Sequence, residues 1–240
     1  MSASPRRPSS AARVFAWGGG AAFVGSLAWF VVFYYAVLGH RAAPRESLVP
    51  HLAIDVLLFG AFAVHHSLFA RDRVKQLITR RLPASLERSM YVWVASLLLA
   101  LVCLAWRPVP GGELYRVDGW PGWVIRGVQI SGLFLSYRVA SALDVLELAG
   151  IRQALGQAQK PRIEVVGPYR WVRHPLYAAW IMFVFGSPDM TADRLTFALV
   201  SSAYIVVAIP WEERSLRATL GEAYSRYMET VKWRVLPFVY

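Results

Sequence analysis

The chain has 240 residues, of which 56% are hydrophobic, 14% aromatic and only 17% charged. This composition is too apolar for an ordinary soluble domain and is typical of a membrane protein. The formal net charge of +11 is suited to contact with anionic lipid headgroups, so we expect no nucleic-acid partner. The single cysteine, Cys103, excludes an intramolecular disulfide and a cysteine-based zinc cluster.

Six apolar segments along the chain are candidates for membrane helices. The first, residues 14–38, is uncharged over 25 positions, which exceeds both the ~20 residues needed to cross a bilayer and a signal-peptide core, so we expect it to be retained. The others are residues 48–70, 90–106, 120–143, 176–188 and 195–211. The sequence therefore predicts an all-α, polytopic membrane protein with about six transmembrane segments in a single membrane domain, residues 1–240.

The last two of these segments are expected to form a hairpin. The fifth has only 13 residues and ends at Gly186-Ser187-Pro188, which break a helix before the sixth begins. Whether the hairpin crosses the bilayer fully or penetrates it in part stays open. Because two segments return the chain to the side that it left in either case, the predicted orientation is the same.

The distribution of cations predicts which side faces the cytoplasm, because short loops rich in Lys and Arg stay there. Of the 26 cations, 19 fall in the amino-terminal segment, the 71–88 loop, the 152–173 segment and the carboxyl tail, whereas the opposite loops hold 5. We therefore expect an integral protein of a bacterial inner membrane with both termini in the cytoplasm. The sequence carries no signal for the oligomeric state.

Two amphipathic stretches are expected to form cytoplasmic interfacial helices. Residues 71–82 place apolar side chains at helical spacing opposite cations, which is typical of a helix lying on anionic lipid. Residues 212–231 repeat this pattern and add Glu–Arg pairs at i,i+4.

Charged residues inside or at the end of a membrane segment are costly and are candidates for function. For Asp55, a structural ion pair with Arg126 or Arg138 is an equal alternative. Asp144 and Glu147 are three positions apart, which on a continuous helix puts both on one face where the fourth segment meets the cytoplasm. Such a face suits either a cationic group or plain solvation.

Two runs of identical residues do not match a metal or nucleotide motif. In His65-His66 the side chains point about 100° apart on a helix, and no further His or Cys lies nearby, so we expect no metal site. Gly18-Gly19-Gly20 lies within a span and predicts close helix packing. Since no G-x-G-x-x-G occurs, a soluble-type nucleotide-binding fold is disfavoured.

The densest group of polar and turn residues is 167–177, G-P-Y-R-W-V-R-H-P-L-Y. Two prolines fix its backbone, Arg173 and His174 offer donors to a carboxylate or phosphate, and its aromatic residues offer faces for a ring. The hairpin would return Glu212 and Glu213 to the same side, where carboxylates bind hydroxyl or ammonium groups. The alternative is structural: Arg173 pairs with one of these glutamates, and the aromatic residues form an interfacial belt.

This segment, followed by E-E-R-S-L-R-A-T-L-G-E-A-Y-S-R-Y and V-L-P, resembles the isoprenylcysteine carboxyl methyltransferase superfamily over residues 167–237. That superfamily consists of integral membrane S-adenosylmethionine-dependent methyltransferases, including phospholipid methyltransferases. Earlier stretches, H-H-S-L-F-A-R at 65–71 and S-P-D-M-T at 187–191, are similar to its methanethiol S-methyltransferase branch. Where that branch tends to have Asn-His, this chain has Asp144-Val145, so the acceptor stays open.

The resemblance implies an S-adenosylmethionine site near the cytoplasmic face, built from residues 144–177 and 211–240. It assigns direct or supporting cofactor contacts to Gly167, Tyr169, Arg173, His174, Pro175, Tyr177, Glu212, Glu213, Arg214, Tyr224 and Tyr227. A general base is needed only if the acceptor arrives protonated, and Asp144, Glu147 and His66, in that order, are the candidates.

The sequence thus predicts an enzyme of EC class 2.1.1 that transfers a methyl group from S-adenosylmethionine to a small or lipophilic acceptor, with a thiol among the candidates. Two alternatives stay open. One is a membrane reductase that uses a nicotinamide cofactor in the same pocket. The other is a non-catalytic membrane partner in nitrogen-oxide metabolism.

Overall fold

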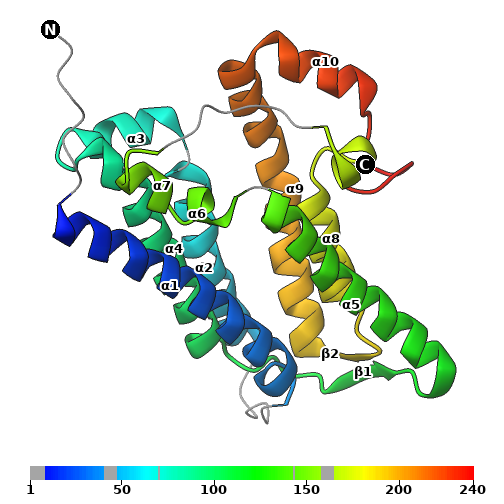
Figure 1. The fold of residues 1–240 in the computed structure, drawn as a ribbon. Coiled ribbons are helices and arrows are strands. Elements are labelled where there is room, and N and C mark those ends of the chain that lie inside the picture. Colours follow the sequence, from blue (N-terminus) through cyan, green and yellow to red (C-terminus); the bar gives the residue numbers. More distant parts are fainter. Residues whose placement is uncertain (1–8, 41–47, 70, 143, 158–164) are drawn as a thin grey trace, which may run out of the picture. The chain divides into compact units, whose positions relative to one another are not determined.

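The computed structural model describes residues 9–40, 48–69, 71–142, 144–157 and 165–240. Several sequence predictions fall outside the described residues: the positions of Arg6, Arg7, Arg41, Arg45, Lys160 and Arg162, the ends of the second and fourth segments at Ala70 and Leu143, and residues 158–164 of the expected cofactor segment. The described chain is mostly helical, as predicted, and divides into two compact units (Figure 1). Each unit is described by itself below.

Unit 1 comprises the described residues of 9–40, 48–107 and 144–157. Its helices are α1 (Ser10–Val32), continued by one π-helical turn (Phe33–Val37), α2 (Leu48–Leu68), α3 (Asp72–Thr79), α4 (Ala84–Ala105), α6 (Val145–Leu148) and α7 (Ile151–Ala154). The long helix α4 packs against both α1 and α2, and α7 packs across α1 and α4. Helix α3 confirms that a helix forms within the amphipathic 71–82 stretch.

The three-glycine run allows α1 and α4 to approach closely, as the sequence predicts. A Cβ on Gly19 would lie 3.1 Å from the Trp93 ring, and one on Gly18 would lie 2.9 Å from it. The Trp93 Nε1–H donates to the Phe15 carbonyl at 3.0 Å, which fixes the ring in this position. The glycines are therefore needed for helix packing.

Unit 2 comprises the described residues of 108–142 and 165–240. Its elements are β1 (Glu113–Arg116), α5 (Gly119–Ala142), a one-turn 3-10 helix (Gly167–Arg170), α8 (Pro175–Phe185), β2 (Asp189–Thr191), α9 (Ala192–Leu220) and α10 (Glu222–Thr230). Helix α8 packs against α5 and α9. The antiparallel β1–β2 ribbon lies at one end of this bundle and α10 at the other (Figure 1). The expectation of an all-α chain did not include this ribbon.

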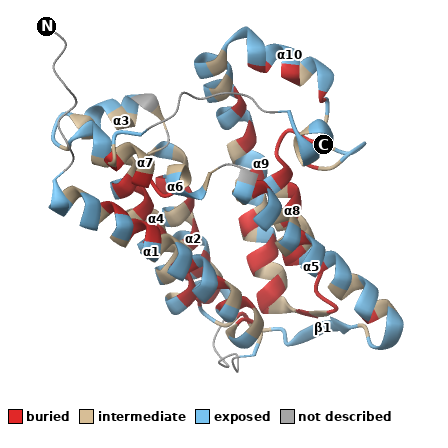
Figure 2. Ribbon diagram, in the orientation of Figure 1, coloured by how far each residue is buried: buried red, intermediate tan, exposed pale blue. Residues whose placement is uncertain are grey.

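Within the described residues, four helices are long and apolar enough to cross a membrane: Ser10–Val37, Leu48–Leu68, Ala84–Ala105 and Ala192–Leu220. Figure 2 shows that buried residues gather where the helices of each unit face one another, while the outer surfaces are exposed. Those outer surfaces carry large apolar side chains, such as Leu57 at 72% and Trp123 at 77% exposure. Exposed apolar helix surfaces of this kind suit a lipid environment, so the chain is an integral membrane protein.

The predicted helix boundary at Trp211 is wrong. Helix α9 runs without interruption from Ala192 to Leu220, with Pro210 inside it, and ends at Gly221, whose φ of +59° suits glycine. The tail helix expected over residues 212–231 is therefore divided: its first part continues α9, and its second part is α10. Glu212 and Glu213 consequently lie on a long rigid helix.

The structure also changes the ion pairs expected within the membrane segments. Arg126 pairs with Asp189 at 2.6 Å, which the sequence did not predict, and Asp55 accepts a hydrogen bond from the backbone N–H of Arg107 at 2.8 Å. Asp189 also forms an ion pair with Arg194, which lies on α9. Burial opposes ionisation of Asp189, but the hydrogen bond and charge of Arg194, with the charge of Arg126, outweigh it and hold the carboxyl pKa below its usual range. This carboxylate thereby joins α5 to α9.

We expect Asp189→Asn to lower the stability of the detergent-purified protein by about 3 kcal/mol at neutral pH, because it leaves two arginines without their shared carboxylate. Because the pKa of Asp189 is lower in the folded than in the unfolded protein, its carboxylate contributes fully to stability above the unfolded pKa of about 3.9. That contribution is lost as the pH falls through the folded pKa. The deficit measured by thermal unfolding should therefore narrow in acid.

Glu113→Gln is the matched control, because Glu113 pairs with Arg116 on the exposed ribbon and should contribute less than about 1 kcal/mol. Equal deficits for the two variants, or a deficit for Asp189→Asn that does not change with pH, would contradict the role given to Asp189.

Candidate functional site

The predicted motif at 167–177 forms a tightly turned segment that leads into α8. Gly167 has a φ of +52° and begins the 3-10 turn. Pro175 occupies the first position of α8, where its missing N–H costs nothing, and His174 precedes it as the cap residue. Arg173 and His174 are thus held at the start of a helix, with both side chains more than nine-tenths buried.

The centre of the site is the buried carboxylate of Glu213, which is only 4% exposed. Its Oε1 accepts a hydrogen bond from Arg173 Nε–H at 2.7 Å and lies 3.3 Å from His174 Nε2. Its Oε2 accepts a hydrogen bond from Arg234 Nε–H at 3.3 Å. One carboxylate therefore contacts three basic side chains from two other segments of the chain. A buried charge is tolerated only when it is paired and hydrogen-bonded in this way.

Hydrogen bonds to backbone carbonyls also join two of these segments, the loop before α8 and the tail. The N–H groups of Arg173 and His174 donate to the carbonyls of Trp233 and Arg234 at 2.9 and 2.8 Å. The Arg173 Nη1 group also donates to the carbonyls of Val231 and Lys232, each at 2.8 Å. Arg173 is therefore used mainly in assembling the site, which agrees with the structural alternative for this residue.

Glu212 has a different environment from its neighbour. Its side chain is 43% exposed, and its Oε2 accepts the Tyr177 hydroxyl at 2.7 Å. The His174 ring stacks on Tyr177 with centroids 5.4 Å apart, and its Nδ1 lies 3.8 Å from Glu212 Oε2. Glu212 is thus an accessible carboxylate with a fixed direction, next to an aromatic surface.

Three tyrosines complete this site. The Tyr227 hydroxyl donates to the Tyr169 carbonyl at 2.8 Å, and its ring packs against Tyr224. Burial raises the pKa of Tyr227 to about 12 and that of Tyr224 well above its ordinary value, so both stay protonated donors at neutral pH. The Tyr224 hydroxyl is buried and has no hydrogen-bond partner among the residues that the structure describes. Such an orphaned polar atom indicates where a polar ligand would bind.

The structure therefore brings most of the predicted cofactor residues together in unit 2. Glu213 with Arg173, His174 and Arg234 is called the Glu213 cluster below. Arg214 is an exception: its guanidinium stacks on Trp211 at 4.6 Å from the ring centroid, and no contact with this cluster is found for it among the described residues. Arg234 was missed, although it lies next to the quoted V-L-P motif. Its Nη1 donates to the Tyr240 hydroxyl at 3.0 Å.

The three candidate bases lie in unit 1, and the expected shared helix face of Asp144 and Glu147 is wrong. Asp144 has a φ of +54° and caps the separate short helix α6. Its Oδ1 accepts the backbone N–H of Leu146, and its Oδ2 pairs with Arg152 at 2.5 Å. Burial opposes ionisation of Asp144, but the Arg152 hydrogen bond and the other donors hold its carboxyl pKa below the usual range.

The second and third candidates have different partners. Glu147 Oε1 accepts Gln153 Nε2 at 2.5 Å. His66 is exposed near the end of α2, and its Nδ1 lies 2.8 Å from the Tyr91 hydroxyl. Within the described ranges, no group of three or more His, Cys, Asp or Glu side chains is arranged to hold a metal ion.

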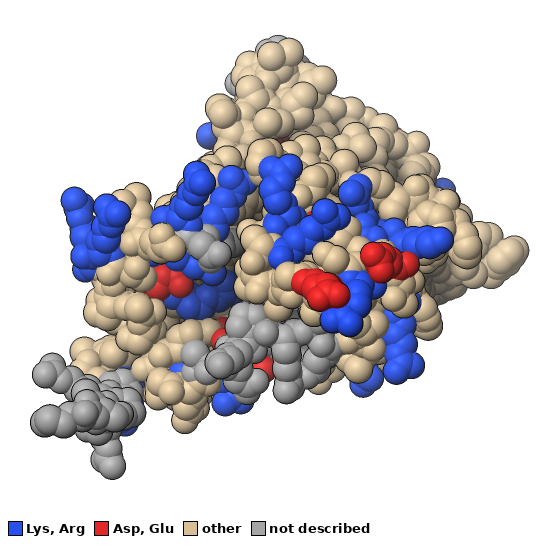
Figure 3. Space-filling model, turned by 90° about the horizontal axis from the view of Figure 1, so that it is seen from above, with Lys and Arg blue, Asp and Glu red and all other residues tan. Residues whose placement is uncertain are grey.

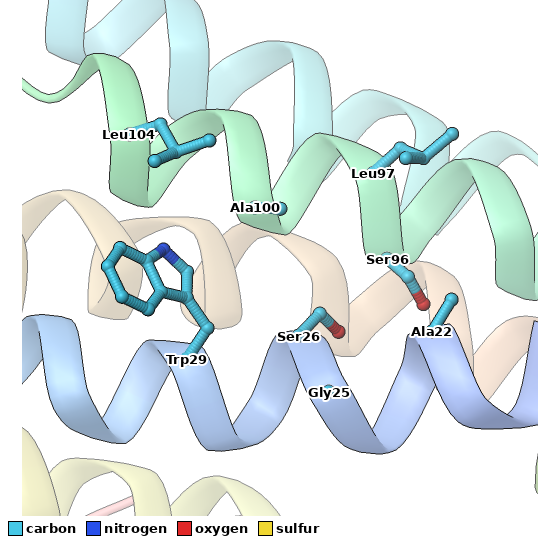
Figure 4. A pocket seen from close by; sticks show the side chains of 8 residues that line it. All are labelled: Ala22, Gly25, Ser26, Trp29, Ser96, Leu97, Ala100 and Leu104. Atoms are coloured by element: carbon cyan, nitrogen blue, oxygen red, sulfur yellow. The ribbon is translucent and has the colours of Figure 1, made fainter.

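A shallow groove between α1 and α4 in unit 1 is lined by small and apolar residues (Figure 4). Ser96 lines it and is 4% exposed, and its hydroxyl has no partner in the described part of the chain. No ionisable side chain lines the groove, so it offers no group for acid–base chemistry.

Comparison with known proteins decides the family. No family model matches the chain. Methanethiol S-methyltransferase 2 of Bradyrhizobium diazoefficiens is 33% identical, covering 88% of this chain and 86% of that protein. The methanethiol S-methyltransferases of Crocosphaera subtropica and Mycobacterium tuberculosis are 36% and 34% identical, covering 81% and 85% of this chain and 78% and 90% of theirs.

The chain belongs to the methanethiol S-methyltransferase family. It is a membrane methyltransferase, as the sequence predicted, and these relatives give no support to the reductase or to the non-catalytic alternative.

We expect Glu213→Gln to destabilise this family member by about 3–5 kcal/mol, because an amide of the same shape leaves buried Arg173 and half-buried Arg234 without a charge partner. Glu212→Gln should cost less than about 1 kcal/mol, since that side chain is exposed. Thermal unfolding in detergent measures both. A Glu213→Gln protein as stable as Glu212→Gln would show that the cluster does not hold the segments together.

Proposed function

We propose that this methyltransferase transfers the methyl group of S-adenosylmethionine to a small thiol delivered from the bilayer. The observation that carries the proposal is the gathering of the 167–177 motif, Glu212-Glu213 and the α10 tyrosines into one polar cluster in a chain of this family. The same motifs support membership of the wider isoprenylcysteine carboxyl methyltransferase superfamily.

The donor set of unit 2 suits this cofactor. S-adenosylmethionine presents hydroxyl groups, an ammonium group and a sulfonium cation, and the accessible carboxylate of Glu212 suits any of these. The orphaned Tyr224 hydroxyl is a donor for a carboxylate or a ring nitrogen. The stacked rings of His174 and Tyr177 provide an aromatic face. Gly167, Tyr169, Pro175, Glu213 and Tyr227 hold these groups in place, and Arg214 is proposed as a supporting cation.

The residues of this chain would contribute mainly by positioning. The cofactor supplies an activated methyl group, and its transfer is an in-line displacement that needs little covalent help from the protein. Glu213 fixes Arg173, His174 and Arg234 on one side, and Tyr177 fixes the direction of Glu212 on the other. This rigidity reduces the entropic cost of aligning donor and acceptor.

The thiol acceptor is proposed from the names of the relatives and requires a base, because the thiolate is the reactive form. Asp144, Glu147 and His66 remain the candidates for that base. The two carboxylates are engaged with Arg152 and Gln153 respectively, and a carboxylate held in an ion pair is a weak proton acceptor.

In the membrane, we propose six segments, with α5 crossing as the fourth and with α8 and α9 as the hairpin. Helix α5 has 24 residues, whereas α8 has only 11, which supports incomplete penetration by α8. Figure 3 shows a face on which Lys and Arg side chains outnumber acidic ones. Exposed cations occur on α3 and next to it in unit 1, and on α9 and α10 in unit 2. This supports a cytoplasmic placement of these helices and of both termini, in an inner membrane.

Calorimetry on the detergent-purified chain tests the cofactor. We expect S-adenosylmethionine to bind the wild type, and Glu212→Gln to bind it about 10- to 100-fold more weakly, because a charged hydrogen-bond acceptor is lost. Glu222→Gln is the matched control, since Glu222 lies in an exposed ion pair on α10. Absence of binding to the wild type, or unchanged affinity in Glu212→Gln, would refute this assignment.

A further inference from the structure

Residues 233–240 of unit 2 form a closed loop, which we call the tail loop. The Tyr240 carbonyl oxygen accepts hydrogen bonds from the backbone N–H groups of residues 234–236 at 2.8 to 3.1 Å. Phe238 and Val239 lie at the turn of this loop and are 86% and 75% exposed. The tail loop thus presents two apolar side chains outward.

The backbone of Phe238 is strained. Its φ is +65°, a region that is disfavoured for a residue with a bulky side chain. The ring contacts Trp233 at a centroid distance of 5.4 Å, yet Phe238 stays almost completely exposed. Such strain persists when another interaction compensates for it. Because burial within unit 2 does not supply that interaction, we look for a partner outside the chain.

The tail loop lies beside the apolar part of α9. Val235 is buried and packs in one cluster with Ala178 of α8 and with Ile205 and Ile209 of α9. Helix α9 is long and apolar enough to cross a membrane, and Ile205 precedes the first glutamate of the E-E pair by about 10 Å along the helix axis. The tail loop therefore lies at a depth where the outer surface of unit 2 faces lipid.

Two backbone hydrogen bonds hold the tail loop at this depth. The N–H groups of Arg173 and His174 donate to the carbonyls of Trp233 and Arg234. Pro175 follows directly and begins the apolar helix α8. In Figure 1 the carboxyl end of the chain lies beside the start of this helix. The apolar turn of the tail loop is thus continuous with a helix surface that is itself apolar.

The segments that meet here also carry exposed cations and an exposed indole ring. Lys232 lies directly before the tail loop, Arg170 lies in the turn before α8, and both are exposed. Trp171, next to Arg170, is 72% exposed. Apolar and aromatic side chains accompanied by cations are typical of a segment that inserts into the surface of a membrane with anionic lipids.

We propose that Phe238 and Val239 insert among the acyl chains of the membrane that holds the protein, so that the tail loop anchors unit 2 beside α9. This inference does not depend on the proposed function. It commits to lipid because the turn continues a surface of α8 and α9 that already suits lipid. The anchor also holds Arg234, which contacts Glu213 at 3.3 Å, so the bilayer stabilises the Glu213 cluster.

Spin-label accessibility tests the insertion in nanodiscs of phosphatidylcholine and phosphatidylglycerol that hold one chain each. A nitroxide on Phe238→Cys is compared with one on Glu229→Cys, an exposed position of α10. The wild type, whose Cys103 is buried, gives the labelling background. Oxygen enters hydrocarbon and a polar nickel complex does not, so the ratio of their collision rates should be about 10-fold higher at position 238. Equal ratios would overturn the proposal.

A charge beside the label tests whether hydrocarbon covers it. Since a carboxylate is costly in hydrocarbon, Val239→Asp should lower the collision ratio at position 238 about 10-fold, toward the value at position 229. Val239→Leu is the matched control and should keep the high ratio. Both substitutions change an exposed side chain, so the fold is retained. A ratio that Val239→Asp leaves unchanged would contradict insertion into lipid.

Nanodiscs that hold two chains distinguish lipid from a second copy of the protein. Insertion into lipid predicts the same oxygen access at position 238 in discs with one chain and with two. Lower oxygen access in the two-chain discs, together with dipolar coupling between the two labels, would assign Phe238 and Val239 to a contact between copies and refute the proposal.

Discussion

The arrangement of unit 2 depends on the cost of burying one negative charge. Glu213 lies on a helix that is otherwise apolar enough to span a membrane, and its carboxylate is almost completely enclosed. Such a charge needs several close cationic partners. Arg173, His174 and Arg234 supply them from segments on either side of α8 and α9. The requirement to pair this charge therefore brings the loop before α8, the C-terminal part of α9 and the tail to one place.

Glu212 and Glu213 have different environments because adjacent side chains on a helix point in different directions. Neighbouring positions on an α-helix differ in direction by about 100°, so when Glu213 faces inward Glu212 cannot. Glu212 remains accessible and is oriented by Tyr177. The pattern E-E predicted that carboxylates would meet the 167–177 motif, but it could not show which one is structural. That distinction depends on Arg234, which has no recognisable spacing to either glutamate.

Features with a strong local signal were predictable, and those set by long-range contacts were not. Hydropathy located the apolar helices, and Gly18-Gly19-Gly20 predicted the close approach of α1 and α4. The β1–β2 ribbon pairs two very short strands more than 70 residues apart, which leaves no periodic pattern. Asp144 has a positive φ, so it cannot continue a right-handed helix, and the sequence does not reveal this conformation. Helix α9 continues past Pro210 and carries Glu213 to its basic partners, contacts that hydropathy alone cannot anticipate.

The position of a charge along α2 decides what that charge can do. Asp55 lies 11 residues before His66, or about 16 Å along the helix axis, and is fully buried against the backbone of Arg107. Proton exchange from such depth is slow and costly, so its role is to fix the chain. His66 lies in the last turn of the same helix, is exposed, and contacts the Tyr91 hydroxyl at 2.8 Å. A polar group at the end of a membrane helix can therefore exchange protons with water, whereas one at the depth of Asp55 serves the packing of the chain.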